Sequence, residues 1–250
     1  MGGKFGICQL CLQHRKLIKA HILPKCFTKP VRNADNSLFL YHADTNRYQD
    51  AYDCLFDKFI LCVSCDNSFS EAENYTSRFF DNIRADILQP DRILEHELGS
   101  QFYYNVEVFK IKKAILSILW RMSITGHKRF RNVSLGILQN ELRKRLEETN
   151  FMEPHFFPIS IISLQNLGDV RGDLIPTYLP SFNHLGSLVY QMQLPGFLIF
   201  IHVTDAATFD VNTTSIEDDS TLVIVEEKDQ ASIAHLDRTF FIPFIKKTKS

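Results

Sequence analysis

The residues with the clearest chemistry are two pairs of cysteines. Cys8 and Cys11 are separated by two residues, and so are Cys62 and Cys65. Two thiolates at this spacing can reach one ion from a tight turn, and two such turns complete the tetrahedral site that structural zinc prefers. The pairs therefore predict one structural Zn²⁺ site. The alternative, four unrelated buried cysteines, is disfavoured because the two spacings are identical.

Fifty residues lie between the two pairs, whereas a simple zinc ribbon has roughly 15–20. The unit must therefore contain an insertion, and the polar stretch 33–52 is the best candidate. Two further cysteines, Cys26 and Cys54, stand outside the pairs, and we interpret both as core residues. Either of them could replace a zinc ligand, and His14 could do so less readily.

Length and composition describe an ordinary globular chain. It has 250 residues, of which 45% are hydrophobic and 23% charged, and these values exclude a disordered, collagen-like or coiled-coil chain. Because 28 Lys and Arg oppose 29 Asp and Glu, the overall charge does not attract nucleic acid. Two acid-free basic segments, 1–34 and 109–131, could hold phosphate locally, or they could simply be solvated surfaces.

No segment predicts export or insertion into a membrane. The first residues lack the apolar run of a secretory signal, and the most apolar stretch, 185–204, is interrupted by Pro195 and Gly196. That stretch predicts a β-hairpin instead. We therefore expect a cytoplasmic protein without membrane contact, in which cysteines are ligands or core residues rather than disulfides.

Hydrophobic periodicity predicts helices first and strands later. Helices are expected at 68–88, where Ser68 and Glu71 form a capping-box pattern, and at 105–125 and 135–148. Short apolar strands are expected at 157–164, 187–193, 197–204, 221–226 and 239–245. The order predicts an α+β fold with a cysteine-bearing unit, a helical middle and a mainly antiparallel C-terminal sheet. We expect two domains, residues 1–90 and 91–250.

The segment between the cysteine pairs carries a family resemblance. Residues 17–25, LIKAHILPK, form a short apolar strand that ends at His21 and is broken by Pro24. With both CxxC pairs and ILCVSCDN before the helix, the first third of the chain resembles the HNH, or ββα-metal (His-Me finger), endonucleases in their zinc-knuckle form. The resemblance implies a zinc-bound, treble-clef-like ββα unit, cleavage of nucleic-acid phosphodiesters, and catalytic Mg²⁺ or Mn²⁺.

By position, the resemblance makes His21 the general base. Asp57 falls near the middle asparagine of the family, and Asp66 or Asn67 falls where its last metal-binding residue stands. The chain departs from the family at Ala20, where many members have an acidic residue, and at Asp66, where many have histidine. The expected nucleic-acid contacts, with DNA favoured over RNA, are the basic residues Arg15, Lys16, Lys19, Lys25 and Lys29.

A second resemblance concerns most of the chain. AHI-x-PK and KKAILSILWRMSIT are similar to segments of uncharacterised bacterial proteins, which resemble accessory genes of mobile elements and phage-defence loci. Within the second motif, we interpret Trp120 as a packing residue. Glu71 and Glu73 are interpreted as charges that favour a helix start rather than as metal ligands.

Two other functions stay open. The first is a catalytically silent zinc module that binds nucleic acid or a protein partner, which Ala20 and Asp66 favour. In that case His21 is a hydrogen-bonded residue of the zinc unit. The second is a regulatory or toxin-like component whose C-terminal sheet senses a ligand or partner.

Overall fold

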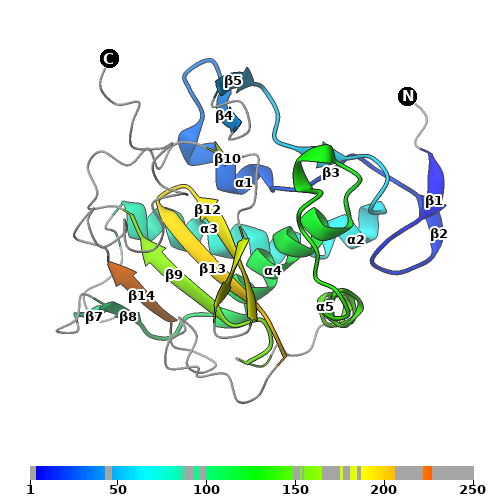
Figure 1. Ribbon diagram of the computed structural model, residues 1–250. Helices are drawn as coiled ribbons and strands as arrows, with labels where there is room; N and C mark the ends of the chain where they lie inside the picture. The colour runs from blue at the N-terminus through cyan, green and yellow to red at the C-terminus, as the bar shows by residue number, and fades with distance from the viewer. Residues whose placement is uncertain are drawn as a thin grey trace.

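The structure of the protein is a computed structural model. The residues that it describes are 4–42, 47–85, 87, 93–95, 100–148, 153, 155–164, 175–176, 181–184, 187–205 and 222–226. Within these ranges the chain has a mixed α+β fold (Figure 1). The helices are α1 (Lys25–Thr28), α2 (Val63–Asn67), α3 (Ser70–Arg84), α4 (Val108–Ile124) and α5 (Leu138–Glu147), with 3-10 turns η1 (Lys29–Val31) and η3 (Lys128–Phe130).

Short strand pairs build the part of the chain that carries the cysteines. β1 (Phe5–Ile7) pairs antiparallel with β2 (His14–Lys16), and β3 (Ala20–His21) pairs antiparallel with β6 (Phe56–Asp57). The predicted insertion contains β4 (Leu38–His42) and β5 (Arg47–Ala51), which pair with each other, and β10 (Ile175–Pro176) lies parallel to β4. The insertion therefore lengthens the chain between β3 and β6 without separating these two strands.

A seven-stranded sheet forms the second half of the fold. Its order is β11 (Ser181–His184), β12 (Ser187–Leu194), β13 (Phe197–Val203), β9 (Ile159–Ser163), β14 (Leu222–Glu226), β8 (Ser100–Tyr103) and β7 (Ile93–Glu95). All neighbours are antiparallel except β9 and β14. The predicted turn between β12 and β13 is confirmed, because Gly196 has a φ of 78° after Pro195, which suits a tight turn.

Helices α3 and α4 lie against one face of this sheet (Figure 1). Phe80 of α3 stacks on Phe197 of β13 with ring centroids 4.3 Å apart. α4 is buried on nearly every side because α3, α5 and the sheet surround it, and Trp120 is part of this core. One apolar core runs from Cys8 to Ile224, so packing is continuous across residue 90, where the sequence predicts a domain boundary.

The three predicted helices are present, and each is shorter than predicted. The capping box predicted for the first of them does not form. α3 begins at Ser70 after Phe69, and no side chain caps it. Ser68 instead donates a hydrogen bond from Oγ to the carbonyl oxygen of Cys65, at 2.8 Å. The chain turns between α2 and α3 at this point, so the Ser68 side chain bonds to the last turn of α2 and does not cap the start of α3. The strand predicted at 239–245 lies outside the described residues.

Among the described residues, no helix is long and apolar enough to cross a membrane.

Lys112 of α4 is fully buried beside the apolar core of the protein. Its Nζ donates a hydrogen bond to the carbonyl oxygen of Glu153 at 2.6 Å. Burial lowers its pKa to about 7, although the Glu153 carboxylate opposes the change. Between pH 7 and about 10.4 the unfolded chain therefore binds more protons at this residue than the folded protein does, so stability rises with pH. We expect the free energy of unfolding, relative to Lys112→Met, to rise by on the order of 3–5 kcal/mol across this range. Urea denaturation of both proteins at each pH measures this difference, and a constant difference would contradict the prediction.

Candidate metal centre and the histidine beside it

The four predicted cysteines come together in the structure. Their Sγ atoms all lie within 4.8 Å of one another, and only Cys11 is more than slightly exposed. The first pair lies in the turn between β1 and β2, where Leu12 adopts a left-handed φ of 57° and donates to the Cys8 carbonyl at 2.9 Å. The second pair opens α2, and the Cys62 amide donates to Cys8 Sγ at 3.4 Å.

The donor set fits a structural metal ion. A tetrahedral zinc with bonds of about 2.3 Å separates its sulfurs by about 3.8 Å, which a cluster of this size permits. Burial alone would raise the pKa of Cys62, but hydrogen bonds, first of all with Ser64, lower it to about 6. Burial raises the pKa values of Cys8 and Cys65. A bound cation would relieve the cost of ionising these buried thiols.

The remaining candidates for ligands lie elsewhere. The Cys54 thiol contacts Thr28 Oγ1 at 3.3 Å, and the Cys26 thiol contacts the Glu73 carbonyl oxygen at 3.7 Å. His14 is exposed on β2 and stacks against Phe5. All three therefore lie outside the four-sulfur cluster.

His21 ends β3 and contacts an aspartate that the sequence analysis missed. Its Nε2 lies 3.1 Å from Asp53 Oδ1, and the two side chains are 22% and 27% exposed. A carboxylate only accepts hydrogen bonds, so Nε2 carries the proton and Nδ1 is the basic nitrogen. No described residue forms a hydrogen bond with Nδ1. The arrangement is that of an imidazole whose orientation is fixed by a carboxylate while its other nitrogen stays free to take a proton.

Two lysines share this carboxylate. Lys19 donates to Asp53 Oδ2, and Lys25 Nζ lies 3.5 Å from Oδ1. Burial alone would raise the pKa of Asp53, but the hydrogen bonds from Lys19 and His21 lower it well below its ordinary value. The Lys19 ammonium also lies 3.8 Å from the centre of the Phe56 ring. The result is an ionised aspartate surrounded by positive charge at the protein surface.

The backbone of His21 is held from the opposite side by a buried arginine. Arg121 of α4 is 2% exposed, and its Nη1 donates to the His21 carbonyl oxygen at 2.8 Å. Its Nη2 forms an ion pair with the buried Glu73 carboxylate of α3, and the guanidinium lies over the ring of Phe69 at 5.3 Å. Glu73 is therefore the partner of a core arginine rather than an exposed helix-start charge.

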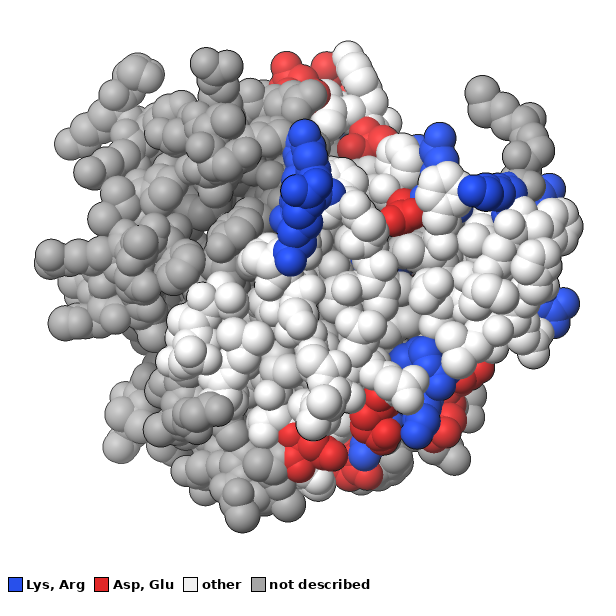
Figure 2. Space-filling view, turned by 45° about the vertical axis from the view of Figure 1, so that its right-hand side comes forward, with Lys and Arg blue, Asp and Glu red and all other residues white. Residues whose placement is uncertain are grey.

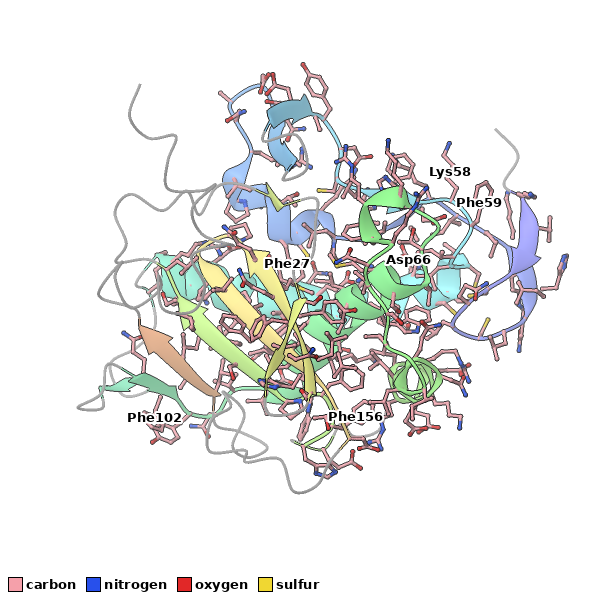
Figure 3. The ribbon with its side chains drawn as sticks, in the orientation of Figure 1. Phe27, Lys58, Phe59, Asp66, Phe102 and Phe156 are labelled. Carbon is pink, nitrogen blue, oxygen red and sulfur yellow. The ribbon has the colours of Figure 1, made fainter. Side chains whose placement is uncertain are left out.

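Of the other predicted site residues, Asp66 is the one brought near His21. It lies half-buried in α2 (Figure 3), and burial raises its pKa, while the positive charges of Arg121 and His21 oppose the rise. Asn67, the next residue, is exposed. In the described part of the chain, the only group of three or more possible metal ligands is the cysteine cluster. His21 and Asp66 therefore do not form a complete protein cage for Mg²⁺ or Mn²⁺.

Asp57 is not brought to His21. In the β3–β6 pair, Ala20 faces Asp57 and His21 faces Phe56, and neighbouring side chains of a strand point to opposite faces. Asp57 accepts hydrogen bonds from Thr125 Oγ1 at 2.6 Å and from the Phe59 amide at 2.8 Å. It joins β6 to the end of α4 instead of completing the histidine site.

The predicted nucleic-acid contacts divide into two groups. Lys19 and Lys25 are next to Asp53, as described above. Lys16 and Lys29 are exposed, and no ion pair with a described residue involves them, while Arg15 is hydrogen-bonded to Gln13. The basic residues therefore extend from the histidine to the outer face of the β1–β2 hairpin.

Comparison with protein-family models, with curated proteins and with solved structures finds no match for this chain in any of the three. The functional argument therefore depends on the geometry of the chain itself.

Proposed function

We propose that the protein is a zinc-stabilised, metal-dependent nuclease of the HNH type, which cleaves nucleic-acid phosphodiesters. The observation that carries the proposal is the His21–Asp53 pair. A partly exposed imidazole, oriented by a carboxylate and flanked by lysines, stands at the end of a strand that lies in sequence between the two cysteine pairs of the cluster. General base, orienting group and phosphate-binding cations are the side-chain chemistry that this reaction requires.

In the proposed reaction, His21 Nδ1 accepts the proton of a water molecule as that water attacks the phosphorus. Asp53 stabilises the imidazolium that forms, because it accepts the hydrogen bond from Nε2. Lys19 and Lys25 would contact the phosphate oxygens, which are a stronger anionic partner than one carboxylate. Arg121 keeps the His21 backbone in place through the carbonyl oxygen.

A divalent ion, when bound, supplies a Lewis acid that stabilises the charge on the phosphate and on the departing 3′ oxygen. Asp66 is the carboxylate best positioned to hold such an ion, with Asn67 beside it. Mg²⁺ commonly uses one or two carboxylates together with phosphate oxygens and water, so this modest set is compatible with an ion that arrives with the substrate. The bacterial resemblance supports a cytoplasmic role in phage defence or in a mobile element as part of the same proposal.

The test is cleavage of supercoiled plasmid, single-stranded DNA and RNA by the zinc-loaded chain in Mg²⁺ or Mn²⁺. His21→Ala should lower the cleavage rate by at least about 100-fold, since a positioned acid–base group contributes this much. Asp53→Asn should lower it less, because the imidazole itself remains. His155→Ala is the matched control, since His155 lies beside Glu153 rather than at Asp53, and it should cleave at the wild-type rate.

A noncatalytic module that binds nucleic acid is the second candidate. The position of Asp57, turned away from His21, favours it. If the wild-type chain binds nucleic acid but cleaves none of the three substrates with either ion, the nuclease proposal is wrong and the module is supported. Equal cleavage by wild type and His21→Ala would also contradict the role proposed for the histidine.

A further inference from the structure

The β1–β2 hairpin presents an outer face on which large apolar and aromatic side chains are exposed beside lysines. We call this face, together with Phe59 next to it, the hairpin surface. Phe5 is 63% exposed, Ile7 49% and Phe59 55%. A patch of this kind on a small zinc-stabilised unit is a common mark of a binding site.

Strand register places Phe5 and Ile7 on one face of the hairpin. Phe5 faces Lys16 and Ile7 faces His14 across the pair, and cross-strand partners point to the same side of a sheet. On the opposite side of the hairpin, Leu17 packs closely against Gly6. A Cβ atom added to Gly6 would lie only 2.9 Å from Leu17 Cδ1. Leu17 belongs to the core, so the hairpin packs through its Gly6 side and its aromatic side stays exposed.

Two aromatic rings on this face, those of Phe5 and His14, are almost parallel. The Phe5 and His14 rings are inclined by 19° with centroids 6.0 Å apart. Phe59 follows β6, and Lys4 Nζ lies 5.3 Å from the centre of its ring; Figure 3 labels Phe59 and Lys58 beside the hairpin. The surface thus offers aromatic rings with ammonium groups close to them.

The β1–β2 hairpin itself carries positive charge only, since residues 1–34 contain no Asp or Glu. Next to Phe59, the Asp57 carboxylate is engaged by the Phe59 amide and by Thr125 Oγ1. Lys16 is exposed, and the lobe at the right of Figure 2, below the grey N-terminal residues, carries blue and white atoms. In a chain with a formal net charge of −1, this local excess of positive charge selects a polyanionic partner.

We propose that the hairpin surface binds single-stranded nucleic acid, with unpaired bases stacked on Phe5, His14 and Phe59 and phosphates contacted by Lys4 and Lys16. The inference deepens the proposed function, since it names unpaired strands as the substrate class. Aromatic rings alternating with cations are the arrangement that single strands prefer. In a duplex the base faces already stack on one another, so exposed rings gain little there.

Two other occupants fit less well. A membrane would be contacted by apolar side chains that enter the lipid as a group, but His14 and the lysines lie among the rings. A protein partner with an acidic surface would use the lysines, yet it gains no particular advantage from rings that lie almost parallel. The membrane is tested below with anionic phosphatidylserine vesicles as a further probe.

The experiment measures binding of the zinc-loaded, full-length His21→Ala chain, which the proposed function makes unable to cleave. The probes are a fluorescein-labelled oligothymidylate, an oligouridylate of equal length and a blunt duplex, in buffer without Mg²⁺ or Mn²⁺. We expect the single strands to bind more tightly than the duplex. Phe5→Leu, which keeps apolar volume but removes the ring, should weaken single-strand binding by about 5- to 100-fold, the range measured for base–aromatic stacking.

Phe5→Trp and Ile137→Ala are the matched controls. Phe5→Trp keeps a stacking ring and should bind like the parent chain, and Ile137→Ala removes an apolar side chain that is exposed outside the hairpin surface. The inference is overturned if the duplex binds as tightly as the single strands, if Phe5→Leu binds like the parent, or if Phe5-dependent binding appears only with anionic vesicles. A wild-type chain that shows ring-dependent binding without cleavage would support this inference and contradict the nuclease proposal.

Discussion

Replacing Cys65 with serine, or removing the metal with a strong chelator, will unfold the amino-terminal part of the protein. The four thiols connect the β1–β2 turn to the start of α2, and most side chains of β1 and β2 are exposed and add little burial. Structural zinc contributes about 10–16 kcal/mol of binding free energy in small units, whereas whole domains are stable by about 5–15 kcal/mol. We expect a loss of at least about 5 kcal/mol, which corresponds to a fall in Tm of roughly 10–20 °C.

The chain contains its own matched control for this prediction. Cys26 is outside the cluster, and its thiol contacts the Glu73 carbonyl oxygen of α3, which a serine hydroxyl can also do. Cys26→Ser should therefore keep one equivalent of metal and a Tm close to that of the wild type. Elemental analysis of the purified proteins and thermal denaturation followed by circular dichroism give the two readouts. A Cys65→Ser protein that retains its metal and its Tm would show that the cluster does not hold a structural ion.

The cysteine cluster could be predicted because its chemistry is local. Two residues between thiols are enough for a turn that presents both sulfurs, so Cys8 with Cys11, and Cys62 with Cys65, are identified without any knowledge of the fold. The assembly of the two pairs then follows from the demand of zinc for four ligands. Helices α4 and α5 and the β12–β13 hairpin were predicted for the same kind of reason, since periodicity and turn residues act over short distances.

The surroundings of His21 could not be predicted in the same way, because they depend on strand register. The sequence indicated Asp57, but a shift of one residue moves a side chain to the other face of a strand. In the structure Asp57 faces Ala20. Asp53 reaches His21 instead, because the residues just before β6 run alongside Ile22, whose amide donates to the Leu55 carbonyl at 2.9 Å. No local pattern distinguishes Asp53 from Asp57.

Arg121 was missed for a different reason. Next to Trp120 in an apolar helix, a single arginine is ordinarily a cation at the edge of the core. Two of its partners are distant in sequence, since His21 is 100 residues away and Glu73 is 48. A buried guanidinium is tolerated only when its partners are already in place, and that condition can be recognised only from the assembled fold.

Arg121→Met will destabilise the protein by about 3–5 kcal/mol. The substitution leaves the Glu73 carboxylate buried without its counter-charge and removes the donor to the His21 carbonyl oxygen. Arg121→Lys should destabilise the protein less than Arg121→Met does, because it keeps the charge. It should still be less stable than wild type, because one ammonium cannot reproduce the guanidinium's simultaneous bonds to Glu73 and to the His21 carbonyl oxygen. Urea denaturation of zinc-loaded protein measures the change, with Lys144→Ala as control. Lys144 lies on the exposed side of α5 near Glu141, where an ion pair contributes about 1 kcal/mol or less.

The double substitution Arg121→Met with Glu73→Leu separates the cost of a broken pair from the value of the intact one. When both charges are removed, no buried ion is left without a partner, so the double variant should be more stable than Arg121→Met alone. It should still be less stable than wild type if the His21 carbonyl oxygen needs the guanidinium as its donor. Additive effects of the two substitutions would contradict the coupling, and a loss below about 1 kcal/mol in Arg121→Met would show that α4 does not anchor the end of β3.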